Sequence, residues 1–245
     1  MGAMLIVLIA IVGWLFYMRQ TDSYDSTWPY RDLTSGSYSG GYDGIDISHY
    51  QGRIHWEEIR KNKHLKFVYV KATEGKSKVD SCYRRNIDSL HACGIPIGAY
   101  HFLKRGATGN QQFANFKRTV SRMDIDLRPV VDCEDDGTRG LSREKIQQML
   151  SAFIKACKEE YGKAPIIYCS ESYYKDYLAP EFDNYMLFIA NYSKEPVLPG
   201  KPKYDIWQYS EKGRLPGIWN WVDLDKLADG VTVDDLKLGG RFDMK

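Results

Sequence analysis

The sequence predicts an α/β fold, namely an irregular (β/α) TIM-like barrel with about eight strands and fewer than eight helices. From Gly44 onward, short apolar runs alternate with amphipathic segments, and this alternation is typical of parallel strands joined by right-handed crossovers. About eight such runs can close a barrel. The last three runs are separated only by loops or short turns, so the helical layer should be incomplete. A chain of 245 residues is long enough for one domain of this kind.

The first four predicted strands each precede a helical pattern. They are the runs at 44–48, 66–72, 95–102 and 129–134. After the second run, Tyr83, Ile87 and Leu90 fall on one helical face. Gly94 suits the position that follows a helix end, and Ser142 suits the N-cap of the helix after the fourth run. The later predicted strands lie at 164–170, 185–192, 204–210 and 220–227. We therefore place the barrel at 44–230 and a C-terminal tail at 231–245.

The N-terminal segment differs in composition from the rest of the chain. Residues 3–18 carry no charge, a stretch shorter than the roughly 20 residues of a spanning helix and longer than the roughly 7–15 of a signal h-region. It lacks a basic flank and a clear cleavage motif, so we expect an uncleaved anchor at 1–19 rather than a cleaved signal. Residues 20–43 are typical of a flexible linker. The barrel should work outside the cytoplasm, membrane-anchored in the periplasm or at the cell surface, or secreted.

Charge and cysteine usage argue against several classes of protein. The formal net charge is +2 and no Lys/Arg stripe stands out, so nucleic acid is not an expected partner. The five Cys form no Cys-x-x-Cys motif, and Cys82 and Cys93 lie about three turns apart on one predicted helix, too far to bridge. The five His show no metal-ligand spacing. We expect no metal, no cofactor, a monomer, and membrane contact only through the N-terminal segment.

Polar residues cluster at the C-terminal ends of the predicted strands, where α/β barrels place functional groups. In chain order they are Asp46 and Ser48, Lys71 and Glu74, Tyr100, Asp132 and Glu134, Tyr168, Asn191 and Tyr192, Trp207, Gln208 and Tyr209, and Asp223 and Asp225. Acids and tyrosines recur at several ends, which a purely structural barrel would not need. Closure of the barrel would bring the acids of the first, fourth and eighth strands together.

The stretch "VVDCEDDG" carries the most informative pair. Side chains alternate along a strand, so Asp132 and Glu134 face one side and Cys133 faces the other. Two carboxyls in one concave site do not both ionise freely, because repulsion and burial raise at least one pKa. A carboxylic acid that stays protonated near neutral pH suits a general acid. Metal binding is the main alternative for this pair. A lone Asp46 is more often structural, and Glu74 is also explained by loop amides or an ion pair with Lys71.

Five motifs occur in order along the predicted barrel. They are "GIDISHYQG" at 44–52, "FVYVKATEG" at 67–75, "GIPIGAYHF" at 94–102, "RPVVDCED" at 128–135 and "YDIWQYS" at 204–210. Together they resemble the glycoside hydrolase family 25 lysozymes, also called Chalaropsis-type muramidases. The resemblance implies an irregular barrel that hydrolyses the β-1,4 bond between N-acetylmuramic acid and N-acetylglucosamine. The implied partner is the glycan strand of bacterial peptidoglycan.

The resemblance also implies roles for individual residues. The catalytic positions that it implies are Glu134, Asp132, Asp46 and Asp223. The substrate-binding positions that it implies are Glu74, Tyr100, Tyr168, Asn191, Tyr192, Trp207 and Gln208. Asp225 stands where the family commonly has Asn. The resemblance therefore identifies Asp223 less sharply as the functional acid of the last strand.

An acid two residues before the proton donor favours assistance by the substrate's own N-acetyl oxygen, with net retention. A carboxylate nucleophile and an inverting route through water are the alternatives. Two other functions stay open, a non-catalytic peptidoglycan-binding barrel and a hydrolase of another β-linked amino sugar such as chitin. The presence of all four acids argues against the binding barrel.

Overall fold

The computed structural model describes residues 39–200 and 203–239. The predicted anchor at 1–19 and residues 20–38 of the predicted linker lie outside the described residues. Within the described residues, no helix is both long enough and apolar enough to cross a membrane.

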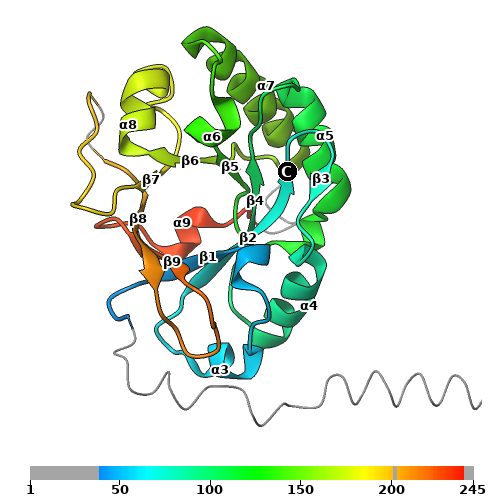
Figure 1. Cartoon of the computed structure of the whole chain (residues 1–245), viewed down its shortest axis with the longest axis vertical. Helices are drawn as coiled ribbons and strands as arrows, with labels where there is room; N and C mark the ends of the chain where they lie inside the picture. The colour runs from blue at the N-terminus through cyan, green and yellow to red at the C-terminus, as the bar shows by residue number, and fades with distance from the viewer. Residues whose placement is uncertain (1–38, 201–202, 240–245) are drawn as a thin grey trace, which may run out of the picture. The chain divides into compact units, whose positions relative to one another are not determined.

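Eight strands form a closed barrel, which confirms the predicted fold class (Figure 1). In chain order they are β1 (Gly44–Ile47), β2 (Phe67–Glu74), β4 (Ile97–Phe102), β5 (Val130–Asp132), β6 (Ile166–Ser170), β7 (Leu187–Ala190), β8 (Ile206–Gly213) and β9 (Val222–Leu227). The short β3 (Lys78–Val79) pairs only with the end of β2. The barrel closes because β1 pairs with β2 on one side and with β9 on the other.

The last strand departs from the parallel arrangement that the sequence pattern predicts. β1, β2 and β4 to β8 run parallel to one another, whereas β9 runs antiparallel to both of its neighbours, β8 and β1. The reason is the connection, since residues 214–221 are fewer than the dozen or so that a parallel crossover needs. β9 therefore enters the barrel at the end where β1 leaves it.

The helical layer is incomplete, as predicted. The α-helices of the described residues are α3 (Trp56–Lys61), α4 (Tyr83–Cys93), α5 (Gly109–Thr119), α6 (Asp135–Thr138), α7 (Arg143–Tyr161), α8 (Glu171–Tyr173) and α9 (Val233–Leu236). The 3-10 helices η1 (His49–Gln51) and η2 (Arg122–Asp124) and the π-helix η3 (Tyr174–Leu178) add short turns. The predicted signals are confirmed, because the Ser142 side chain caps α7 and Gly94 ends α4 at a φ of 69°.

Strand alternation divides the core into two layers. The helices cover the outward-facing side chains of the strands and the residues just after them, such as Val131 and Cys133. The barrel interior is filled by inward-facing side chains, such as Tyr69, Val130 and Phe188. Leu236 of α9 is fully buried with the interior group, and its carbonyl accepts a hydrogen bond from the Arg128 backbone at 2.8 Å. α9 therefore closes the end of the barrel at which the parallel strands begin. The folded unit continues past the predicted boundary at residue 230.

Candidate active site

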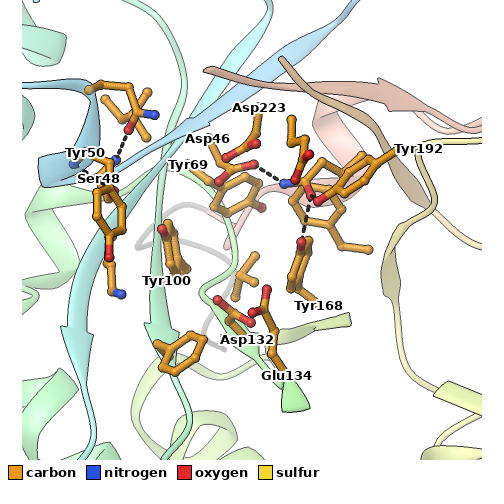
Figure 2. A pocket seen from close by; sticks show the side chains of 18 residues that line it. Asp46, Ser48, Tyr50, Tyr69, Tyr100, Asp132, Glu134, Tyr168, Tyr192 and Asp223 are labelled. Atoms are coloured by element: carbon orange, nitrogen blue, oxygen red, sulfur yellow. Dashed lines mark hydrogen bonds between the residues drawn. The ribbon is translucent and has the colours of Figure 1, made fainter. Parts of the chain in front are cut away.

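A cavity of about 370 Å³ opens at the C-terminal ends of the barrel strands (Figure 2). Side chains from all eight barrel strands, or from the residues just after them, line it. The predicted site residues that line it are Asp46, Tyr100, Asp132, Glu134, Tyr168, Tyr192, Gln208 and Asp223. The barrel therefore brings together all four predicted catalytic acids.

Asp132 and Glu134 enter the cavity from the end of β5. Asp132 is the last residue of the strand, and Glu134 is the N-cap residue of α6. Both side chains reach into the cavity in Figure 2, while Cys133 between them is fully buried on the helix side. Alternation along the strand is the physical reason for this division.

The two carboxyls behave electrostatically as a pair. Burial, reinforced by the neighbouring Glu134 carboxylate, raises the pKa of Asp132 well above its usual range. Burial and the Asp136 carboxylate raise the pKa of Glu134. Asp132 Oδ1 is buried and has no hydrogen-bond partner among the described residues. Two adjacent buried carboxyls resist ionising together, so this arrangement suits an acid beside a carboxylate.

A second acidic pair faces the first from across the cavity. Asp46 on β1 and Asp223 on β9 are directly opposite in the strand register, and the Asp223 carboxyl donates a hydrogen bond to Asp46. Burial, followed by repulsion from Asp46, raises the pKa of Asp223 to about 9. Burial and the Asp225 carboxyl raise the pKa of Asp46. Asp223 therefore stays protonated near neutral pH, which suits its role as the donor to Asp46.

Gln208 links the acids to two tyrosines. Its Oε1 accepts hydrogen bonds from the hydroxyls of Tyr168 and Tyr192, both at 2.7 Å, and its Nε2 donates to Asp46 Oδ2 at 2.6 Å (Figure 2). Gln208 is buried, so the amide is held in one orientation by three partners. The network joins β6, the end of β7, β8 and β1, and it positions the Asp46 carboxylate.

Two of the predicted substrate-binding residues lie outside this cavity because of strand alternation. Trp207 and Gln208 are consecutive on β8, so only one of them faces inward. Trp207 faces out and its Nε1 donates to the Asn191 carbonyl at 2.8 Å. Asn191 lines a neighbouring hollow of about 580 Å³, which shares Glu134, Tyr168 and Tyr192 with the main cavity.

Glu74 also lies outside the cavity lining, where an ion-pair cluster holds it. Its carboxylate contacts Lys71 at 3.2 Å, Lys78 at 3.1 Å and Lys104. Burial opposes ionisation, but the hydrogen bonds from Lys104 and Lys78 prevail and lower the pKa of Glu74 to about 2. The sequence suggests an ion pair with Lys71 as the structural explanation of Glu74, and the structure contains this ion pair.

Lys71 lines the cavity, although it is absent from the predicted site residues. It is buried and is the only cationic side chain in that lining among the described residues. Its ammonium lies 4.8 Å from the centroid of the Phe102 ring and lowers the pKa values of Asp132 and Glu134. The signal was available in the sequence, since alternation on β2 places Lys71 on the inward face with Tyr69.

The structure separates the two late acids. Asp223 lines the cavity, whereas Asp225 is fully buried inside the barrel, and neither of its carboxyl oxygens has a hydrogen-bond partner among the described residues. Burial raises the pKa of Asp225 well above its usual range, and Asp223 reinforces this effect. Asp223 is therefore the late acid available to a ligand. In the part of the chain that the structure describes, no group of three or more His, Cys, Asp or Glu is arranged to hold a metal ion.

Residues 45–218 match the family described as glycosyl hydrolases family 25. This chain belongs to that family. The autolytic lysozyme of Clostridium acetobutylicum is 31% identical over 194 residues, covering 78% of this chain and 57% of that protein. Lysozyme M1 of Streptomyces globisporus is 31% identical over 204 residues, covering 77% of this chain and 68% of that protein.

Solved structures agree with the family 25 assignment. The lysozyme of Streptomyces coelicolor superposes with a TM-score of 0.73 at 29% identity, covering 82% of this chain and 97% of that one. A family 25 glycosyl hydrolase from Bacillus anthracis gives 0.72 at 29% identity, covering 80% and 94%. The chain is therefore a glycoside hydrolase of the lysozyme type, with the irregular barrel expected of it.

Proposed function

We propose that this family 25 enzyme is an N-acetylmuramidase. It would hydrolyse the β-1,4 bond between N-acetylmuramic acid and N-acetylglucosamine in bacterial peptidoglycan. The observation that carries the proposal is the Asp132/Glu134 pair, which shares one cavity with the hydrogen-bonded Asp46/Asp223 pair. The lysozymes among its relatives support the choice of substrate.

In the first step, Glu134 donates its proton to the glycosidic oxygen as the bond from that oxygen to the anomeric carbon breaks. The carbonyl oxygen of the substrate's own N-acetyl group forms a bond to the same carbon, giving a cyclic oxazolinium ion. Asp132, as the carboxylate of the pair, accepts a hydrogen bond from the amide N–H and stabilises the positive charge that develops there. The placement of both carboxyls at one strand end supports these complementary roles.

In the second step, water attacks the anomeric carbon and opens the oxazolinium ring. The Glu134 carboxylate takes the proton from that water, which restores the starting enzyme. Two inversions at one carbon give a product of retained configuration. Asp46, held by Gln208 and Asp223, binds the sugar and keeps the cavity potential negative, which stabilises the cationic transition state.

The test is digestion of purified peptidoglycan by wild type and by Glu134→Gln. Mass spectrometry should find new reducing N-acetylmuramic acid ends with wild type, and the variant should lose activity by several orders of magnitude while keeping its thermal unfolding midpoint. NMR of the first product should show the β anomer. Release of N-acetylglucosamine ends, or preferential cleavage of chitin oligomers, would support the alternative amino-sugar hydrolase. Binding without cleavage would support a non-catalytic barrel.

We also propose that the barrel acts outside the cytoplasm, because peptidoglycan lies there. The uncharged segment at 3–18 supports export, as an anchor or as a signal. Fractionation of cells that express the full chain, followed by detection of the barrel with and without external protease, tests the location. A barrel recovered only from the cytoplasm would contradict it.

A further inference from the structure

We propose that Tyr50, Trp219 and Trp221 form an aromatic rim that binds the glycan strand where it leaves the catalytic cavity. The rim is a binding surface separate from the acidic residues that carry the chemistry. This inference rests on the proposed muramidase function, because the occupant is the continuation of the same glycan strand.

Exposure singles these side chains out. Tyr50 is 70% exposed, Trp219 is 51% exposed and Trp221 is 50% exposed. In the described part of the chain, the one other exposed aromatic side chain is Tyr192, which lines the cavity. Large aromatic side chains are usually covered in a soluble monomer, so their accumulation at one place marks a binding surface.

Hydrogen bonds hold the two segments of the rim side by side. Tyr50 belongs to η1, directly after β1, and Trp219 and Trp221 belong to the loop that joins β8 to β9. The Asn220 side chain donates to the Tyr50 carbonyl at 2.9 Å, and the Gln51 side chain donates to the Trp221 carbonyl at 2.8 Å. The rim is thus ordered before any ligand arrives, which lowers the entropy cost of binding.

A second set of contacts anchors the β8–β9 loop to Ile54 and His55. The His55 amide donates to the Gly217 carbonyl at 2.8 Å, and Ile54 forms an isolated β-bridge with Ile218. The Arg214 guanidinium lies 5.4 Å from the centroid of the Trp221 ring, a distance that suits a cation–π contact. These contacts restrain the Trp221 ring at the protein surface.

The rim is continuous with the catalytic cavity. Tyr50 and Gln51 line that cavity, and Trp221 lies two residues before Asp223, which lines it too. A glycan strand that passes the Asp46/Asp223 pair on its way out therefore meets the rim next. Pyranose rings carry apolar C–H faces that stack on flat aromatic surfaces, and the exposed rings of the rim offer such surfaces outside the acidic cavity. A polymer of sugars fits this continuity better than a separate protein partner does.

The experiment compares substrates of different length. Peptide-free glycan strands are prepared as a tetrasaccharide and as long strands, and kcat/KM is measured on each for wild type, Trp221→Ala and the double variant Trp219→Ala/Trp221→Ala. We expect the ratio of kcat/KM on long strands to that on the tetrasaccharide to fall about tenfold or more in the double variant. Trp221→Phe, which keeps an aromatic ring, should recover most of the ratio. Met123→Ala, which removes an exposed apolar side chain from η2, is the matched control.

If the folded double variant keeps the wild-type ratio of kcat/KM on long strands to that on the tetrasaccharide, the rim does not bind the glycan strand. A defect that appears only when the stem peptides are attached would also overturn the proposal, because the rim would then recognise peptide. If wild type cleaves neither substrate, the proposed function fails, and the rim is tested by binding of the long strands. Equal affinity of wild type and the double variant would then overturn it, and weaker binding by the double variant would support it. If the alanine variants do not fold, Trp221→Phe against Trp221→Gln gives the same comparison.

Discussion

Asp46 and Asp223 face each other across the β1–β9 register and are joined by a hydrogen bond in which Asp223 is the donor. Asp46 also accepts a hydrogen bond from Gln208 Nε2 at 2.6 Å. The antiparallel course of β9 creates this arrangement, because it brings the start of β9 to the end of β1. The catalytic cavity therefore contains two carboxyl pairs, and burial raises the pKa of all four groups.

The two members of this pair should tolerate amide substitution differently. In Asp223→Asn the amide still donates to Asp46, so kcat/KM on peptidoglycan should stay within about tenfold of wild type. Asp46→Asn replaces one carboxylate oxygen, which accepts hydrogen bonds, with an NH2 group, which donates them. That group then faces the donor of Gln208 or of Asp223, so kcat/KM should fall about a hundredfold or more. Equal losses in the two variants would contradict the assigned donor and acceptor.

The same pair predicts a feature of the pH profile. The pKa of Asp223 is about 9, so wild type should lose activity above that pH as Asp223 ionises next to Asp46. Asp223→Asn cannot ionise, and its profile should lack this alkaline step. Activity of both proteins is compared between pH 7 and 10 on the same peptidoglycan. A step of equal size in the variant would assign it to another group.

Lys71 should set the pH range in which the Asp132/Glu134 pair holds one proton. Its ammonium lowers the pKa values of both carboxyls, so Lys71→Met should raise them. The acid limb of the kcat/KM profile should move to higher pH by about one unit, and Lys71→Arg should restore it. Lys78→Met is the control, because Lys78 also pairs with Glu74 but is exposed outside the cavity. A Lys71→Met profile that coincides with wild type would refute this role.

Asp225 should lower the stability of the protein as the pH rises. Its pKa is raised in the folded state, so between its unfolded pKa and that higher value the folded protein binds more protons than the unfolded chain. Stability then falls with rising pH across that window. Asp225→Asn removes the titration and should be the more stable protein at pH 8 by about 1 kcal/mol or more, with little difference at pH 4. Urea unfolding at both pH values measures this. If the unfolding free energies of Asp225→Asn and wild type differ by the same amount at pH 4 and pH 8, titration of Asp225 is not the cause of the difference.

Substitutions at two neighbouring positions on β8 should differ strongly in their effect on activity. Gln208→Leu leaves Asp46, Tyr168 and Tyr192 without their shared partner, so kcat/KM should fall about a hundredfold. Trp207→Phe removes only an outward hydrogen bond to the Asn191 carbonyl, and kcat/KM should change less than about threefold. Both variants need a folded control by circular dichroism. A larger loss in Trp207→Phe than in Gln208→Leu would reverse the inward and outward assignment.

Much of the site could be predicted because it depends on local patterns. Apolar runs and helix signals such as Ser142 and Gly94 have short-range physical causes, and they appear in the structure where the sequence placed them. The same holds for the division of Asp132, Cys133 and Glu134 between the two faces of a strand, since the period of two is intrinsic to extended backbone. The same period places Trp207 on the opposite face of β8 from Gln208, outside the cavity lining.

The sequence by itself determined the barrel, its family and the acids at its strand ends, because these follow from local periodicity and from motifs in order. Only the tertiary structure decided which groups touch. The direction of β9, the contact between Asp46 and Asp223, the interior place of Leu236 and the pairing of Lys104 with Glu74 depend on strand register and closure. Register couples residues that are far apart in the chain, and no local pattern contains that information.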